Sequence, residues 1–197
     1  MTPPEPDAAP SRRYRGQSAE DRREARRLAL IEAAIRLYGE RGFANTSIEA
    51  VSAEAGLIKR YFYESFPSAE ALLVAAFEQI TRALFERIDT AAAGQTPAVP
   101  AMLTAFFSAL HEHPQFARVF FVEMSGVGPA AEAALEASRL ALAGRLIGPG
   151  GDPASLSAAG ATGAIRQIAL SWIGGGYAEP LPAVVAAATA ACATLTR

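Results

Sequence analysis

Two cations and two phenols stand close together in the sequence Lys59, Arg60, Tyr61, Phe62, Tyr63. Lysine and arginine side chains can donate hydrogen bonds to the O6 and N7 atoms of guanine in the major groove of DNA. Tyrosine hydroxyl groups commonly bond the phosphate oxygens of the DNA backbone. These four polar side chains therefore suit the binding of double-stranded DNA, provided that the chain holds them on its surface.

The apolar residues around this segment predict that its polar side chains point outward. Gly56 permits a sharp turn, and a short helix over residues 58–63 follows it. If Leu57, Phe62 and Phe66 face inward, the two cations and the two phenols are left outside. An exposed helix of this kind fits the major groove.

A longer helix is predicted to precede and support this segment. Ser18 is a suitable N-cap for it, the acidic first turn favours its start, and Gly42 is a natural stop. Apolar residues recur at intervals of three and four along it, which predicts one buried stripe. The stripe consists of Leu28, Ile31, Ile35 and Tyr38.

A second short helix is predicted between these two elements. Residues 46–49, with the sequence Thr-Ser-Ile-Glu, predict a capping box at its start. The exposed amides and hydroxyls of Thr46 and Ser47 can hold a phosphate there. Its inner stripe consists of Ile48, Val51 and Ala55. Two short helices joined by a glycine turn, after a longer helix, have helix-turn-helix geometry.

Charge is distributed unevenly along the chain. Residues 11–63 contain eleven Lys and Arg against seven Asp and Glu, whereas residues 64–197 contain seven against eleven, although the total net charge is only −2. Part of the basic excess is a cluster of arginines, which can contact phosphates or the minor groove, or can form a solvated tail and helix face. The cluster consists of Arg12, Arg13, Arg15, Arg22, Arg23, Arg26 and Arg27.

The composition favours an all-α protein in a reducing compartment. Prolines divide the chain after residue 66 into helix-sized pieces with helical periodicity and little strict alternation. The single cysteine, Cys192, excludes an intramolecular disulfide and a cysteine-rich zinc site. No stretch has the roughly 20 strongly apolar residues that a membrane helix needs. We therefore expect a cytoplasmic protein.

The residues of this basic region resemble the TetR family of bacterial transcriptional regulators. The resemblance covers about residues 29–73 and is carried by an ordered series of short motifs. These are IEAAIRLY at 31–38, Gly42-Phe43, TSIEAV at 46–51, AEAGL at 53–57, Tyr63, FPS at 66–68 and EALL at 70–73. Such an ordered string is more specific than a lone helix-turn-helix pattern.

The resemblance implies a fold of about nine helices, in which the first three bind DNA and the others bind a small molecule and dimerise. It implies a tail over residues 1–17, expected to be disordered, a DNA-binding domain over 18–66 and a ligand-binding and dimerisation domain over 67–197. The family's DNA contacts fall on Thr46, Ser47, Lys59, Arg60, Tyr61 and Tyr63. The chain departs from the family at Arg60, where glycine is common, and at Ala69, where lysine is common. These departures affect the operator sequence rather than the fold.

The helices after residue 69 carry aromatic and methionine residues that can line an apolar cavity or form the core. Ligand sites in helical bundles lie between helices, and the resemblance supports such a site. We single out Phe77, Met102, Phe106, Phe120 and Met124 as ligand-binding candidates, with Phe85, Phe116 and Phe121 nearby. Because few polar side chains occur among them, the predicted effector is apolar or weakly polar.

The last two predicted helices, over residues 156–172 and 182–195, are rich in small residues. By resemblance, they pair with their copies in a four-helix interface. A two-fold dimer would present two recognition helices to a pseudo-palindromic operator.

The sequence offers little for catalysis or metal binding. His111 and His113 are two apart, so on a helix they face different ways, and we do not expect them to share a metal. Cys192 has no nearby histidine, which favours a buried small residue over a nucleophile. No phosphate-binding loop or HExxH motif is present, so we predict no enzyme activity, no metal and no cofactor.

The sequence therefore predicts a DNA-binding transcriptional regulator, most simply a repressor that a small ligand releases. The alternative is a small-molecule-binding or enzymatic helical protein whose basic region is incidental. Attachment to a membrane surface through the arginine cluster is disfavoured, because acidic residues interrupt the cluster and it lacks a long apolar face. Residues 59–63 discriminate between these interpretations, because an enzyme has no need for two cations and two phenols exposed on one short helix.

Overall fold

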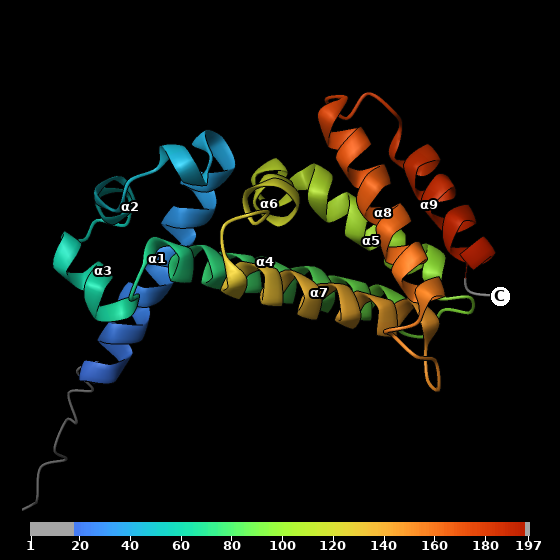
Figure 1. The fold of residues 1–197 in the computed structure, drawn as a ribbon, viewed down its shortest axis with the longest axis horizontal. Helices are drawn as coiled ribbons and strands as arrows, with labels where there is room; N and C mark the ends of the chain where they lie inside the picture. The colour runs from blue at the N-terminus through green and yellow to red at the C-terminus, as the bar shows by residue number, and fades with distance from the viewer. Residues whose placement is uncertain (1–17, 196–197) are drawn as a thin grey trace, which may run out of the picture.

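The computed structural model describes residues 18–195, so the predicted tail, with Arg12, Arg13 and Arg15, lies outside the described residues (Figure 1). The described part contains nine α-helices, a short 3-10 helix and a π-helix, and it has no strand, which confirms the all-α prediction. In chain order the elements are α1 (Ala19–Arg41), η1 (Phe43–Asn45), α2 (Ile48–Glu54), α3 (Lys59–Ser65), α4 (Ala69–Ala92), α5 (Val99–Glu112), α6 (Pro114–Arg118), η2 (Val119–Glu123), α7 (Pro129–Ile147), α8 (Leu156–Gly174) and α9 (Leu181–Leu195).

Helices α1 to α3 form one end of the molecule, which we call the head, and α4 to α9 form the body (Figure 1). The predicted start of α1 is confirmed, because Asp21 N donates to Ser18 Oγ over 3.0 Å and Ser18 N donates to Asp21 Oδ2 over 2.9 Å. This capping box satisfies two amides that have no partner within the helix. The helix ends at Gly42, whose φ of 88° favours glycine.

The buried stripe of α1 differs from the prediction at its first residue. Ile31, Ile35 and Tyr38 are buried as expected, but Leu28 is 42% exposed. Leu30 is completely buried instead. The core-facing row continues from Leu30 at intervals of four and three, through Ala34 and Leu37. Leu28 lies to one side of this row, so it does not reach the core.

Helix α4 joins the head to the body (Figure 1). It begins at the N-cap Ser68, whose side chain accepts a hydrogen bond from Ala71 N over 3.1 Å. The spacing of its apolar residues predicts one stripe along the helix, and this stripe is buried. The stripe consists of Leu73, Phe77, Ile80, Leu84 and Ile88. One continuous helix therefore contacts α1 at one end and α5 and α7 farther along.

The segment after α5 is not one regular helix. A short α6 is followed by the π-helix η2. Val119, Phe120 and Phe121 are successive residues, and all three are buried. A regular α-helix would spread them over different faces. The wider turn of a π-helix brings them closer to one face, and such turns occur frequently at functional sites.

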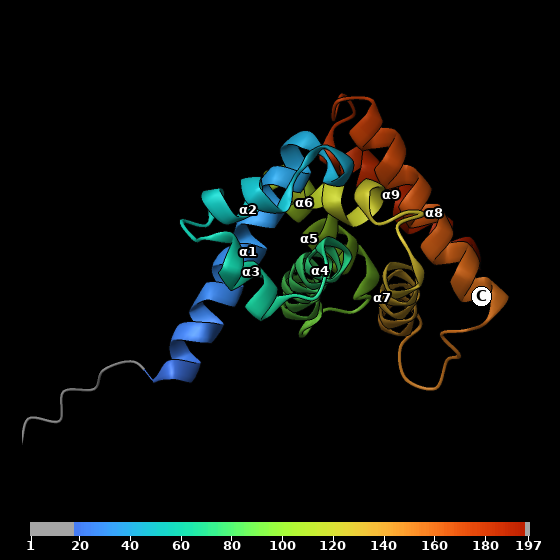
Figure 2. The ribbon, with the colours of Figure 1, turned by 60° about the vertical axis from the view of Figure 1, so that its left-hand side comes forward.

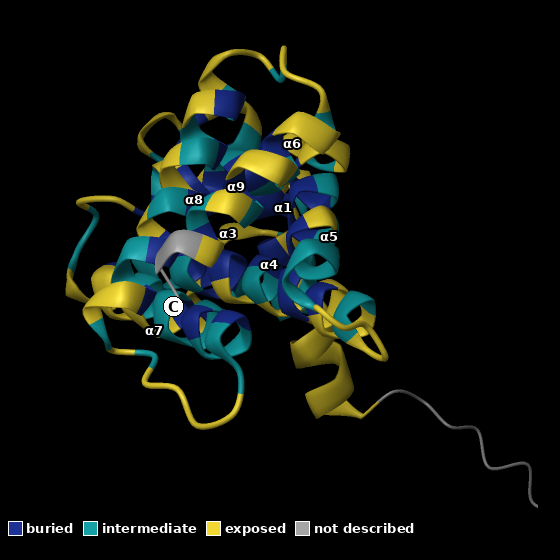
Figure 3. Cartoon of the chain, turned by 90° about the vertical axis from the view of Figure 1, so that its right-hand side faces the viewer, coloured by how far each residue is buried: buried dark blue, intermediate teal, exposed yellow. Residues whose placement is uncertain are grey.

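Helices α7, α8 and α9 complete the body, and α8 and α9 match the segments predicted for the last two helices closely. The Arg145 guanidinium bonds both oxygens of Asp89 over 2.8 and 2.9 Å, which ties α7 to α4. Cys192 is buried on α9, as the sequence predicts. Figure 2 shows α8 beside α9 on one side of the body. Figure 3 shows that buried residues gather where the helices face one another. None of the helices between residues 18 and 195 is both long and apolar enough to cross a bilayer.

Candidate nucleic-acid interface and cavity

The polar side chains of helix α3 point outward, and two aromatic rings beneath the helix are buried. Phe62 is 0% exposed and Phe66 is 3% exposed, with their ring centroids 6.0 Å apart. Leu57 is partly buried against the same core. Tyr63 is 55% exposed. Lys59 and Arg60 are also exposed, whereas Tyr61 is only partly so. The orientation predicted from spacing is therefore present, with Tyr61 more covered than expected.

Both cations of α3 are paired with carboxylates. Arg60 Nε donates to Glu64 Oε1 over 2.8 Å, one helical turn away. Lys59 Nζ donates to Glu49 Oε1 on α2. This hydrogen bond raises the pKa of Lys59 and lowers the pKa of Glu49. Because exposed ion pairs contribute little to stability, a DNA phosphate or base edge can compete for these cations.

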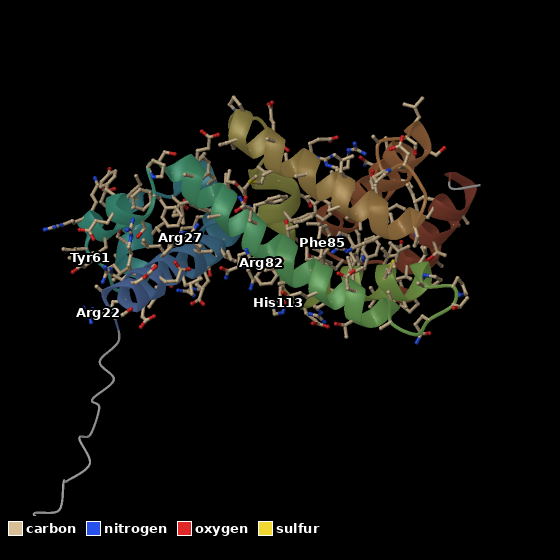
Figure 4. All side chains as sticks on the ribbon, turned by 90° about the horizontal axis from the view of Figure 1, so that it is seen from below. Arg22, Arg27, Tyr61, Arg82, Phe85 and His113 are labelled. Atoms are coloured by element: carbon tan, nitrogen blue, oxygen red, sulfur yellow. The ribbon has the colours of Figure 1, made fainter. Side chains whose placement is uncertain are left out.

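Arginines of α1 pack directly on α3, a role that sequence spacing alone could not show. Arg23 Nη2 donates to the Glu64 carbonyl over 3.2 Å. The Arg26 guanidinium lies 4.5 Å from the centroid of the Tyr61 ring, and this contact explains why Tyr61 is partly covered. Arg27 lies 4.9 Å from the Phe66 ring centroid. Figure 4 shows Arg22, Arg27 and Tyr61 at the same end of the molecule, so the arginines of α1 and the cations of α3 form one basic surface.

The start of α2 differs from the predicted capping box by one residue. Ser47 is the N-cap, and its hydroxyl accepts from Ala50 N over 3.1 Å. The Thr46 hydroxyl instead donates to the Gly42 carbonyl over 2.7 Å. The N-cap lies one residue later than predicted because the 3-10 helix η1 occupies residues 43–45 and ends at Thr46. Ser47 is exposed and Thr46 partly exposed, so both stay accessible at this end of α2.

The body contains a cavity of about 320 Å³ between α4, α5, η2, α7 and α8. Three of the predicted ligand-binding residues, Phe77, Phe106 and Phe120, line it together with Phe121. The Phe77 and Phe120 rings are stacked with centroids 5.1 Å apart. Met102 and Met124 do not line it. Met124 is completely buried in the core, and Met102 is partly buried against it.

The expectation of few polar side chains around the cavity is wrong. Helices α7 and α8 contribute both charged and neutral polar groups to its wall. These residues are Glu132, Glu136, Ser138, Arg139, Thr162 and Arg166. Sequence periodicity alone could not show that these residues of α7 face α8. The cavity therefore combines an aromatic wall with a polar one.

The π-helix η2 contacts both the cavity and the head. Phe120 and Phe121 line the cavity, and Glu123 lies at the other end of the same short element. Glu123 Oε2 accepts from Phe43 N over 2.7 Å, and its Oε1 accepts from Arg118 Nε over 2.8 Å. We call these contacts, with the bond of 3.2 Å from Arg118 Nη1 to the Glu40 carbonyl, the head–body link. The Glu123 side chain is only 11% exposed, so little water competes for these bonds.

Residues 30–76 match the family model described as bacterial regulatory proteins, tetR family. This part of the chain is thus a TetR-family domain. The matched residues span most of the head and the beginning of α4, and they include α2 and α3 completely.

Individual relatives agree with this placement. The uncharacterized HTH-type transcriptional regulator YerO of Bacillus subtilis (strain 168) is 31% identical over 99 residues, which are 48% of this chain and 34% of YerO. The chain thus spans about a third of the length of this curated relative.

Two solved structures show the same fold over most of the chain. FadR from Bacillus subtilis, in complex with stearoyl-CoA, has a TM-score of 0.71 at 17% identity and covers 86% of this chain and 97% of its own. The multidrug binding protein EbrR, complexed with imidazole, has a TM-score of 0.68 at 18% identity, with 84% and 94% covered.

Proposed function

We propose that this TetR-family protein is a sequence-specific DNA-binding regulator, a repressor that leaves its operator when a small molecule occupies the cavity. The observation that carries the proposal is the orientation of α3. Phe62 and Phe66 are buried beneath this helix, and Lys59, Arg60 and Tyr63 are exposed on its outer face. A helix that binds in a DNA groove must be held in position by packed residues beneath it, so that its polar side chains reach the groove. The adjoining arginines of α1 add the positive charge that attracts a phosphate backbone.

The decisive experiment is recovery of an operator. The purified full chain would be incubated with genomic fragments, and bound fragments would be footprinted. We expect protected pseudo-palindromic sites whose half-sites are about one helical turn, or a multiple of it, apart. Failure to select any sequence over bulk DNA would favour the alternative of a small-molecule-binding or enzymatic helical protein.

Base readout and backbone contact can be separated on α3. Arg60→Ala is expected to reduce the preference for one base pair by roughly ten-fold, because a bidentate arginine contact contributes discrimination of that order. Tyr63→Phe is expected to weaken all sites alike, since a phosphate contact carries no sequence information. Binding would be measured by fluorescence anisotropy on the recovered operator and on single-base variants.

Arg82→Ala is the matched control for Arg60→Ala, because Arg82 is an exposed arginine on α4. It should leave the binding of every site unchanged. If Arg60→Ala and Tyr63→Phe both behave like this control, α3 is not the recognition helix.

Dimerisation through α8 and α9 is part of the proposal. Ala183, Ala186 and Ala187 are exposed on α9, and such small residues let a second copy approach closely. Ala187→Glu is expected to convert a dimeric mass at micromolar concentration into a monomeric one, measured by sedimentation equilibrium. Thr90→Glu, an exposed change on α4, should leave the dimer intact. A monomeric wild-type mass would contradict this part of the proposal.

The fold supports a small molecule as the effector. FadR was solved in complex with stearoyl-CoA, and EbrR is described as a multidrug binding protein. In this chain, the cavity and the head–body link share the element η2. A ligand that shifts η2 can therefore change the position of the head. Coupling free energies between such sites are typically about 1–3 kcal/mol, or a 5- to 150-fold change in affinity.

A further inference from the structure

The cavity wall has one fully apolar side and one side with unused hydrogen-bonding groups. Phe106 packs against Phe120 and Phe121, with each pair of ring centroids 6.2 Å apart, and this aromatic side comes from α5 and η2. The polar lining residues come from α7 and α8. A ligand that fills such a space must itself have an apolar part and a polar part.

Arg139 on α7 supplies the clearest polar signal. Its Nε and Nη2 donate to the two oxygens of Glu136 over 2.8 and 2.6 Å, a bidentate pair that fixes the plane of the guanidinium. Its Nη1 is buried and has no hydrogen-bond partner among the described residues. Leaving a buried donor without an acceptor is unfavourable, and more so when the donor is charged. An acceptor supplied by a ligand would remove this penalty.

Two further groups on the same wall are also without partners. Ser138 is 8% exposed and lines the cavity, and the described part of the chain offers its hydroxyl no hydrogen bond. Arg166 on α8 is exposed at the cavity and forms no ion pair within residues 18–195. By contrast, the buried Thr162 hydroxyl is already bonded to backbone carbonyls over 2.9 and 3.2 Å. The unused groups on this wall are thus mainly donors.

The charge of the wall does not favour a cationic ligand, although glutamates and aromatic rings could form a site for one. Glu136 is engaged by both nitrogens of Arg139. Glu132 is exposed, so water can solvate its carboxylate. The buried group that lacks a partner is a positively charged donor, which requires an acceptor.

From these contacts we infer that the cavity takes a small amphipathic carboxylate, with the carboxylate against Arg139 and Ser138 and the apolar tail against Phe106 and Phe120. This inference rests on the proposed role of the cavity as the effector site. A volume of about 320 Å³ lies at the lower end of the usual range for ligand pockets, so the tail is short or medium in length.

Isothermal titration calorimetry with the full chain tests the inference without DNA. The probes are octanoate, octan-1-ol and octyltrimethylammonium, which share a tail and differ in the head group. We expect octanoate to bind most tightly. Arg139→Met is expected to weaken octanoate binding by about ten-fold or more, because hydrogen bonds to charged groups are the strong ones, and to change octan-1-ol binding little.

Two variants control for charge and for folding. The double variant Glu136→Gln with Arg139→Met keeps the local net charge and should weaken octanoate binding as the single variant does. Arg82→Met, an exposed change on α4 outside the cavity lining, should bind octanoate like the wild type. Thermal melting would establish that each variant is folded.

The inference is overturned if no probe binds, if octyltrimethylammonium binds more tightly than octanoate, or if the folded Arg139→Met variant retains wild-type affinity for octanoate. None of these results would affect recovery of an operator by footprinting. Failure of the ligand class and failure of the proposed regulator are therefore distinguishable.

Discussion

Replacing Phe62 with alanine is expected to lower the free energy of unfolding by about 3–5 kcal/mol, the typical cost of truncating a buried phenylalanine. Phe62 is completely buried and lies edge-on to Tyr63, with ring centroids 5.3 Å apart. Its removal would leave a cavity under a helix of only seven residues, Lys59–Ser65. A helix this short depends on its packing rather than on its own stability. Operator binding should therefore be lost at temperatures at which the body is still folded.

Chemical denaturation, followed by circular dichroism, would give the free energy of unfolding, and fluorescence anisotropy would give operator affinity. Ile58→Ala is the matched control, because Ile58 is 63% exposed and borders the same helix. It should change stability by about 0.5 kcal/mol or less, as surface substitutions usually do. If Phe62→Ala binds the operator with full affinity, packing of the Phe62 ring does not hold α3 in its DNA-binding position.

The outward orientation of α3 could be predicted because it depends on local spacing alone. Three apolar residues, Leu57, Phe62 and Phe66, determine which face of the helix is buried. The long stripe of α4 was predictable for the same reason, since a 3.6-residue period repeated over about four turns indicates an amphipathic helix and not a strand. Local deviations were not predictable. The turn η1 delays α2 by one residue, and η2 replaces regular helix between α6 and α7.

The polar half of the cavity and the head–body link depend on contacts between distant parts of the chain. Glu123 meets Phe43 across 80 positions of sequence, and no periodicity indicates such a pairing. Arg139 and Glu136 are three residues apart and are typical of a solvent-exposed helical pair. Only the crossing of α8 over α7 turns that pair into a cavity wall. Sequence spacing therefore identified the surface of α3, and tertiary packing determined the rest of the site.

Glu123→Ala is expected to uncouple the cavity from the head. The change removes the acceptor for Phe43 N and for Arg118 Nε. Leaving these groups without a partner should reduce stability by about 1–3 kcal/mol. The larger effect should be on regulation, because η2 would no longer be bonded to the head's backbone. We expect the ratio of operator affinities without and with effector to fall toward one from the 5- to 150-fold range typical of such coupling.

The measurement is operator release by the first compound that a release screen on the recovered operator identifies. Glu123→Gln keeps one oxygen that can accept from Phe43 N, but its amide cannot form an ion pair with Arg118, so its response should be intermediate. Val122→Ala is the neighbouring control, because Val122 is 48% exposed and lies outside the link. If Glu123→Ala still binds the compound and releases DNA like the wild type, the signal does not pass through the link. Helix α4, which lines the cavity through Phe77 and also contacts α1, would then be the remaining direct route.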